Sequence, residues 1–131
     1  MSRISLAEFQ ARVLAEFPEL AEDFADHDGL PYLQMGSFSW LMEEAKGRGD
    51  WEVYARAARL ADELWGNADE GLENALNVSL LEHLDFEGRC GPHAWSLLSP
   101  RLQRAWQDMA AYNEWLHSGA KGPPPGSADS A

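Results

Sequence analysis

Four histidines are the first residues to examine for acid–base or metal chemistry in this 131-residue chain. His27 lies between Asp26 and Asp28, but adjacent positions point in different directions, and no second group of ligands stands at a metal-binding spacing. His83 falls on the apolar face of an expected helix, where a local carbonyl or an acidic neighbour usually satisfies the imidazole. We therefore expect His27 to be a solvated loop residue and His83 to be a structural core residue.

Cys90 is the only thiol, and Arg89 and His93 stand close to it in the sequence. A cation and an imidazole can activate a thiol as a nucleophile. The neighbouring Gly88 and Gly91 leave this loop without the rigid support that such a pair needs, so we expect a bystander thiol. A single cysteine cannot form a disulfide within the chain, which favours a reducing compartment and hence the cytoplasm.

Recognisable catalytic motifs are missing from the sequence. It contains no Gly-x-Ser-x-Gly, no phosphate-binding glycine loop, no His-Glu-x-x-His and no Cys-x-x-Cys. Adjacent carboxylates such as Glu43 and Glu44 diverge on a helix and cannot face each other as an acid–base pair. We expect no catalytic residue, no metal site and no cofactor. An enzyme assembled from distant residues around His83 or Cys90 is the least favoured alternative.

Helix start and stop signals divide the chain into segments that would position these residues. Ser5 and Glu8 form a capping-box pattern that starts a helix, and Pro18 interrupts it. Residues 26–31 are turn formers, and the next helix is expected to start near Ser37. That helix is expected to stop at Gly49, and Asp50 caps the helix that follows. Asp69 is expected to cap a further helix, and Ser99–Pro100 to start the last one.

Apolar residues recur at three- and four-residue spacing, which is the period of amphipathic helices, and no strand-like alternation appears. The helix after Asp69 is apolar on more than one side, which is typical of a central helix. Its broad face includes His83 and Leu84, whereas Val78 and Leu81 point elsewhere. The expected core side of the last helix is formed by Leu102, Trp106, Met109, Asn113 and Leu116, with Trp115 roughly opposite.

The sequence therefore predicts an all-α fold, an irregular bundle of five to seven helices that includes helical-hairpin pairs. One such hairpin turns at Gly49–Asp50. The helical domain spans residues 1–117. Residues 118–131 are expected to form a flexible Pro/Gly/Ser tail, because they have few apolar groups to offset the entropy lost on ordering.

The net charge of -12, from 22 acidic and 10 basic residues, narrows the range of partners. Nucleic acids and anionic membranes attract clustered lysine and arginine, so neither is an expected partner. No signal peptide or membrane-spanning run is expected either. A negative field speeds encounter with a basic protein, which is the partner class that the charge favours.

Acidic residues are also unevenly distributed. Residues 13–45 contain eight acidic residues and no lysine or arginine, and residues 62–87 contain another eight, again without a basic residue. Such blocks indicate one or two acidic surfaces. We predict a partner-binding surface around the turn at residues 66–69. Its members are Asp62, Glu63, Asp69, Glu70 and Glu73, with Trp115 as an aromatic anchor.

The order of these elements resembles that of small helical immunity proteins of bacterial polymorphic toxin systems. The resemblance covers residues 30–117 approximately. Three segments carry it: Gly49–Trp51 between two helices, the helical segment Glu73–Leu84, and Ser99–Leu102 at the start of the last helix. It implies a protein that neutralises a cognate toxin domain by direct binding and occlusion. A helical adaptor or chaperone that binds a peptide or an effector protein remains the alternative.

Overall fold

A computed structural model describes residues 3–119 of the chain, which fold into seven α-helices joined by short turns. The elements in chain order are α1 (Leu6–Glu16), the 3₁₀ turn η1 (Pro18–Leu20), α2 (Ala21–Asp26), α3 (Pro31–Arg48), α4 (Trp51–Asn67), α5 (Glu70–Ala75), the π turn η2 (Leu76–Leu80), the 3₁₀ turn η3 (Leu81–His83), α6 (Gly91–Ser96) and α7 (Pro100–His117). The predicted all-α fold is confirmed. Within residues 3–119 the only β pairing is an isolated bridge between Ile4 and Ala68.

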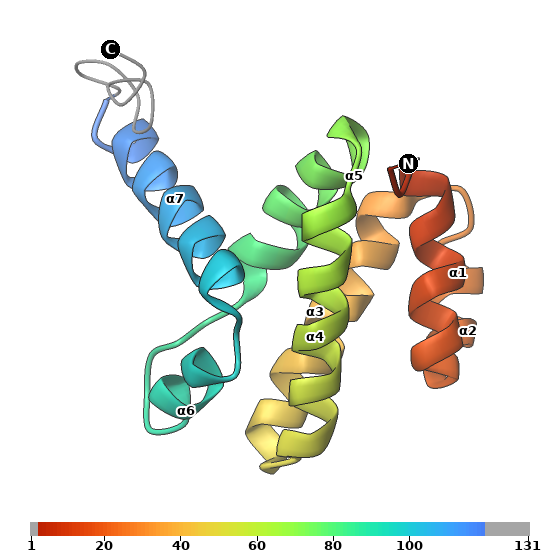
Figure 1. Cartoon of the computed structure of the whole chain (residues 1–131), viewed down its shortest axis with the longest axis horizontal. Helices are drawn as coiled ribbons and strands as arrows, with labels where there is room; N and C mark the ends of the chain where they lie inside the picture. The colour runs from red at the N-terminus through yellow and green to blue at the C-terminus, as the bar shows by residue number, and fades with distance from the viewer. Residues whose placement is uncertain (1–2, 120–131) are drawn as a thin grey trace.

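The helical hairpin of α3 and α4 occupies the centre of the molecule (Figure 1). α1 and α2 pack on one flank of α3, and α6 and α7 lie on the opposite side. The segment from α5 to η3 connects the flanks, because it contacts α1 at its start, α3 in its middle and α7 at its end. The expected tail lies outside the described residues, apart from Ser118 and Gly119 next to the end of α7.

The predicted caps are confirmed. The Ser5 hydroxyl accepts a hydrogen bond from the Glu8 amide at 3.2 Å, and the Glu8 carboxylate accepts one from the Ser5 amide at 3.3 Å. Gly49 has a positive φ of 73° at the end of α3, a conformation that glycine adopts without steric cost. Three other side chains accept from the first turn of their helices, namely Asp50 for α4, Asp69 for α5 and Ser99 for α7.

The predicted start of α3 near Ser37 is wrong, because the helix begins six residues earlier, at Pro31. The turn-forming residues 26–31 include this proline, but its fixed φ also suits the first position of a helix. The early start is held in place by Gln34, whose buried side-chain amide donates to the Phe24 carbonyl of α2 at 2.9 Å. The additional helical turn carries Tyr32 and Leu33 on the outside of the molecule.

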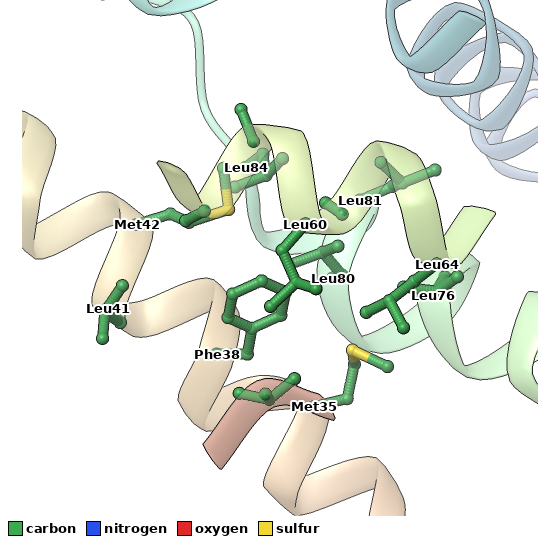
Figure 2. Close-up of a cluster of buried hydrophobic side chains, with 14 of the residues drawn as sticks. Met35, Phe38, Leu41, Met42, Leu60, Leu64, Leu76, Leu80, Leu81 and Leu84 are labelled. Carbon is green, nitrogen blue, oxygen red and sulfur yellow. The ribbon is translucent and has the colours of Figure 1, made fainter. Parts of the chain in front are cut away.

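The centre of the core lies where α3, α4 and η2 meet, and Figure 2 shows some of its side chains. The figure labels Met35, Phe38, Leu41, Met42, Leu60, Leu64, Leu76, Leu80, Leu81 and Leu84, all of them buried. Burying a side chain of this size contributes about 1.5–3 kcal/mol relative to leaving it in water. Buried alanines on α4, such as Ala57 and Ala61, let the neighbouring helices approach closely.

The expected continuous helix after Asp69 is instead α5, a π turn and a 3₁₀ turn. A π turn closes its hydrogen bonds over one more residue than an α-helix, so the residues that follow it are rotated. The expected core histidine, His83, is therefore exposed. Leu81, which was expected to point elsewhere, is buried with 1% exposure. The prediction of a core His83 is wrong because it assumed an unbroken 3.6-residue period.

This rotation predicts that two nearby substitutions change the stability by very different amounts. Leu81→Ala leaves a cavity in the core and should lower the free energy of unfolding by about 2–5 kcal/mol. His83→Ala removes an exposed side chain and should change it by less than about 0.5 kcal/mol. Urea unfolding followed by circular dichroism would measure both values. A loss for His83→Ala as large as that for Leu81→Ala would contradict the rotated register.

Candidate functional site

A groove runs between α7 on one side and α5 and η2 on the other, and it encloses a volume of about 620 Å³. It is lined by Trp65, Glu73, Asn74, Asn77, Val78, Glu82, Ala105, Asp108, Met109, Tyr112, Asn113 and Leu116. These residues come from α4, α5, the turns η2 and η3, and α7. Segments that are far apart in sequence therefore build this groove together. We call it the α5–α7 groove.

Large apolar side chains line the α5–α7 groove and remain open to solvent. Val78 is 38% exposed, Tyr112 44% and Leu116 46%. Trp65 and Met109 are partly buried beside them. Single exposed apolar residues are ordinary, but several on one concave surface are typical of a binding site.

Negative charge surrounds this apolar surface. Glu73, Glu82 and Asp108 line the groove, whereas no lysine or arginine in the described part of the chain does so. Asn113 donates a hydrogen bond to the Glu82 carboxylate at 2.9 Å, which orients that carboxylate across the groove from α7. The groove therefore combines apolar contact area with unopposed negative charge.

An aromatic cluster fixes the position of α7 relative to the rest of the molecule. Phe86, Trp95 and Trp106 pack edge to face, with ring centroids 5.0–5.5 Å apart. The indole N–H of Trp106 also donates to the Leu84 carbonyl at 3.2 Å. These contacts hold the N-terminal half of α7, and the helix continues beyond them (Figure 1). Its C-terminal half supplies Met109, Tyr112, Asn113 and Leu116 to the groove lining.

The chain belongs to the DUF7674 family. The family, described as a domain of unknown function, matches residues 11–114, which include all but one of the groove-lining residues. No curated protein and no solved structure matches the chain.

Among the residues predicted to bind a partner, Asp62 has a contact within the molecule. Its carboxylate accepts two hydrogen bonds from Arg101, at 2.8 and 3.0 Å, and one from the Ser99 hydroxyl at 2.6 Å. The hydrogen bond from Arg101 lowers the pKa of Asp62 more than partial burial raises it, and Ser99 lowers it further. Gly66 makes room for this pair, because a Cβ there would overlap the Arg101 guanidinium.

Two further predicted residues also have intramolecular partners. Glu63 forms an ion pair with Arg12 of α1 at 2.7 Å. Asp69 caps α5 by accepting a hydrogen bond from the Leu72 amide at 2.9 Å. Asp62, Glu63 and Asp69 thus link or cap helices, and these contacts compete with any role in partner binding.

The remaining predicted residues lie closer to the groove. Glu73 lines it, and Glu70 is exposed three residues earlier at the start of α5. Trp115 is half-buried on α7, and its ring centroid lies 5.5 Å from that of Tyr112, which lines the groove. A role in partner binding stays a prediction for all six residues.

Sequence reasoning missed Val78, Asp108 and Tyr112 as groove residues. It placed Met109, Asn113 and Leu116 on the core side of α7. Met109 does pack against the core and also lines the groove, whereas Asn113 and the exposed Leu116 line the groove instead. The apolar stripe on α7 was recognised correctly, but no other segment of the described chain covers its C-terminal half. An amphipathic stripe that extends beyond the covered core is the signal that could have indicated this site.

The residues considered for catalysis divide between two places: His27 and His83 line one pocket beside α3, and Cys90 and His93 lie at the start of α6. His93 packs edge to face on Trp51 with ring centroids 4.4 Å apart, and Cys90 is half-buried as a free thiol. Over residues 3–119 no group of three or more His, Cys, Asp or Glu side chains is placed to hold a metal ion. None of the helices in that range is long and apolar enough to cross a membrane.

The Asp62–Arg101 contact predicts a pH-dependent stability difference. Because the pKa of Asp62 is lowered in the folded protein, its contribution is present above the ordinary value near 3.8 and is lost as the pH falls through the folded value. Asp62→Asn should therefore lower the melting temperature at neutral pH, and the difference from wild type should shrink below about pH 4. Asp108→Asn, an exposed carboxylate on α7, is the matched control. An Asp62→Asn difference that did not vary with pH would contradict this assignment.

Proposed function

We propose that this protein binds a basic, amphipathic helical segment of a partner protein in the α5–α7 groove, and that it acts as an immunity protein or inhibitor that neutralises the partner by occluding it. The observation that carries the proposal is the composition of the groove. Exposed apolar side chains lie between carboxylates, and no lysine or arginine among residues 3–119 lines the site.

The apolar surface suits a helical segment better than a flat one. The C-terminal half of α7 presents Met109, Tyr112 and Leu116 at three- and four-residue spacing, and Val78 faces the groove from η2. An amphipathic helix laid into such a groove buries its own apolar stripe against these side chains. Removing this area from water contributes to affinity at roughly 25 cal/mol per Å² before the costs of ordering are subtracted.

The charges select the kind of segment. Glu73, Glu82 and Asp108 can pair with lysine or arginine beside the apolar stripe of the partner, and an acidic segment would be repelled. The net charge of -12 adds a long-range field that speeds encounter with a basic protein. Carboxylates at the edge should act mainly on the association rate, whereas the apolar anchors should act on dissociation.

The immunity function rests on this groove together with the sequence resemblance to immunity proteins. An acidic protein that holds a segment of a basic toxin domain can mask the toxin's active surface. The second candidate is a helical adaptor or chaperone, which the concave shape of the groove also favours. The two functions differ in whether binding blocks the activity of the partner. The single free thiol is compatible with action in a reducing cytoplasm.

Binding at the groove can be tested with a synthetic peptide of about 18 residues, five helical turns, that has a leucine stripe and lysine and arginine elsewhere. Fluorescence anisotropy should show binding that weakens with salt. The double variant Glu73→Lys/Asp108→Lys should lower the affinity about tenfold or more, mainly through slower association. Tyr112→Ala/Leu116→Ala should instead speed dissociation.

Glu19→Lys/Glu22→Lys provides the matched control, because it changes the net charge equally at exposed positions outside the groove. This variant should retain most of the affinity. An equal loss for the two lysine pairs would show that only the overall field attracts the peptide, and the α5–α7 groove would then not be its binding site.

The immunity function itself predicts protection of cells. Co-expression with the toxin domain encoded by the neighbouring gene should allow growth with the wild type and with the Glu19→Lys/Glu22→Lys control, but not with Glu73→Lys/Asp108→Lys. Colony counts and recovery of the complex measure the outcome. A complex that leaves the partner active would favour the adaptor function. Failure of the wild type to bind the toxin would exclude immunity and leave the peptide result on the groove intact.

A further inference from the structure

Exposed large hydrophobic side chains occur at two places on the described surface. Val78, Tyr112 and Leu116 belong to the α5–α7 groove. The other four lie at the start of α3 and along it as far as its middle, and they are Leu30, Tyr32, Leu33 and Trp40. Leu33 and Trp40 form a cluster at one pocket, and exposed apolar residues that gather in this way often mark a binding site.

A pocket of about 440 Å³ adjoins this cluster, and we call it the Trp40 pocket. Its lining comes from three places: α2 with the turn after it, α3, and the end of η3. Trp40 is 59% exposed, which leaves much of its ring open to a ligand. Gly36 and Ser37 are small, and a Cβ at Gly36 would meet nothing within 4 Å, so the wall on α3 is open beside the ring.

Two carboxylates and two imidazoles supply the titratable groups of the Trp40 pocket, from Asp23, Glu43, His27 and His83. Lys46 donates to one Glu43 oxygen at 2.8 Å and offsets its charge. The other Glu43 oxygen is buried. Asp23 is exposed on α2, and within residues 3–119 its side chain forms no ion pair. Asp23 is therefore the carboxylate available to a ligand.

We propose that the Trp40 pocket is a second binding site and that it receives an arginine side chain of a partner protein. The guanidinium stacks on the Trp40 ring and donates to the Asp23 carboxylate, while its aliphatic stem packs on Leu33. A planar guanidinium can make both contacts at once, and an ammonium group cannot stack in this way. A second copy of this chain is a poor occupant, because each copy has a net charge of -12.

This site goes beyond the function proposed for the α5–α7 groove and shares no lining residue with it. The segment from α5 to η3 separates the two. Asn74 lines the groove and donates to the Tyr32 hydroxyl of α3 at 2.6 Å. Glu82 lines the groove, and His83, the next residue, lines the Trp40 pocket. A partner can therefore occupy either site without the other.

The experiment is a titration of the ¹⁵N-labelled full chain with capped arginine, N-acetyl-arginine amide, followed by NMR. The Trp40 indole and Gly36 amide signals should shift with a dissociation constant on the order of 1–10 mM, as expected for one side chain without its protein. Capped citrulline has nearly the same shape without the charge and should bind at least about fivefold more weakly. Capped lysine should also bind more weakly than capped arginine.

Variants assign the contacts. Asp23→Asn should weaken binding about fivefold, measured at the Trp40 indole, and Asp26→Asn on the same helix should not change it. Trp40→Ala should abolish the shift of the Gly36 amide. Asp23 and Trp40 are both exposed, and circular dichroism would check that the fold is retained in the variants. The groove variant Glu73→Lys/Asp108→Lys should bind capped arginine like the wild type, which separates this test from that of the groove.

Three outcomes would overturn the proposal. One is equal binding of capped citrulline and capped arginine, and another is unchanged binding by both Asp23→Asn and Trp40→Ala. The third is an absence of saturable shifts at the pocket up to a capped-arginine concentration of about 100 mM. The dissociation constant would then be larger than one stacked, charge-assisted contact should give.

Discussion

The burial of the segment from Leu76 to Leu84 against α3, α4 and α7 is the constraint on which the rest of the structure depends. Leu76, Leu80 and Leu81 fill the core from this segment, and the Leu84 carbonyl accepts the hydrogen bond that anchors Trp106 of α7. The π turn allows the chain to bury these leucines although a regular helix would have directed some of them elsewhere. The apolar core thus selects a locally unusual backbone.

The same π turn determines which side chains face outward. The rotation that buries Leu81 exposes His83 to the Trp40 pocket, while Asn77, Val78 and Glu82 line the α5–α7 groove. One short segment therefore forms a wall of both candidate sites. π turns occur frequently at functional sites, because the extra residue re-aims side chains that a regular helix would place differently. The position of the turn between two sites is consistent with this general role.

The acidic residues of this protein have two different roles. Asp62, Glu63 and Asp69 face donors within the chain, and they hold α4 to α7, join α4 to α1 and cap α5. Others, such as Glu73 and Asp108, lie beside exposed apolar side chains of the groove. No basic residue in the groove lining offsets their charge. A high net charge thus does not by itself locate a binding surface. The proposed partner site therefore rests on the carboxylates next to an uncovered apolar stripe.

The sequence by itself determined the helical class and most of the helix boundaries. Caps such as Ser5, Asp50 and Ser99 act on amides three residues away, so the signal and its partner lie within the same short window. The apolar stripe of α7 was also readable, because it depends only on the helical period.

Only the tertiary structure decided which parts of these stripes are covered and where the helical period changes. The stripe on α7 predicted Leu116 as a core residue, yet the described segments cover only the first half of that helix, and the remainder forms a groove wall. The positions of His83 and Leu81 depended on a π turn that the core imposes from α3 and α4. Burial is a property of several segments packed together, so a local pattern can predict an apolar face without fixing what lies against it.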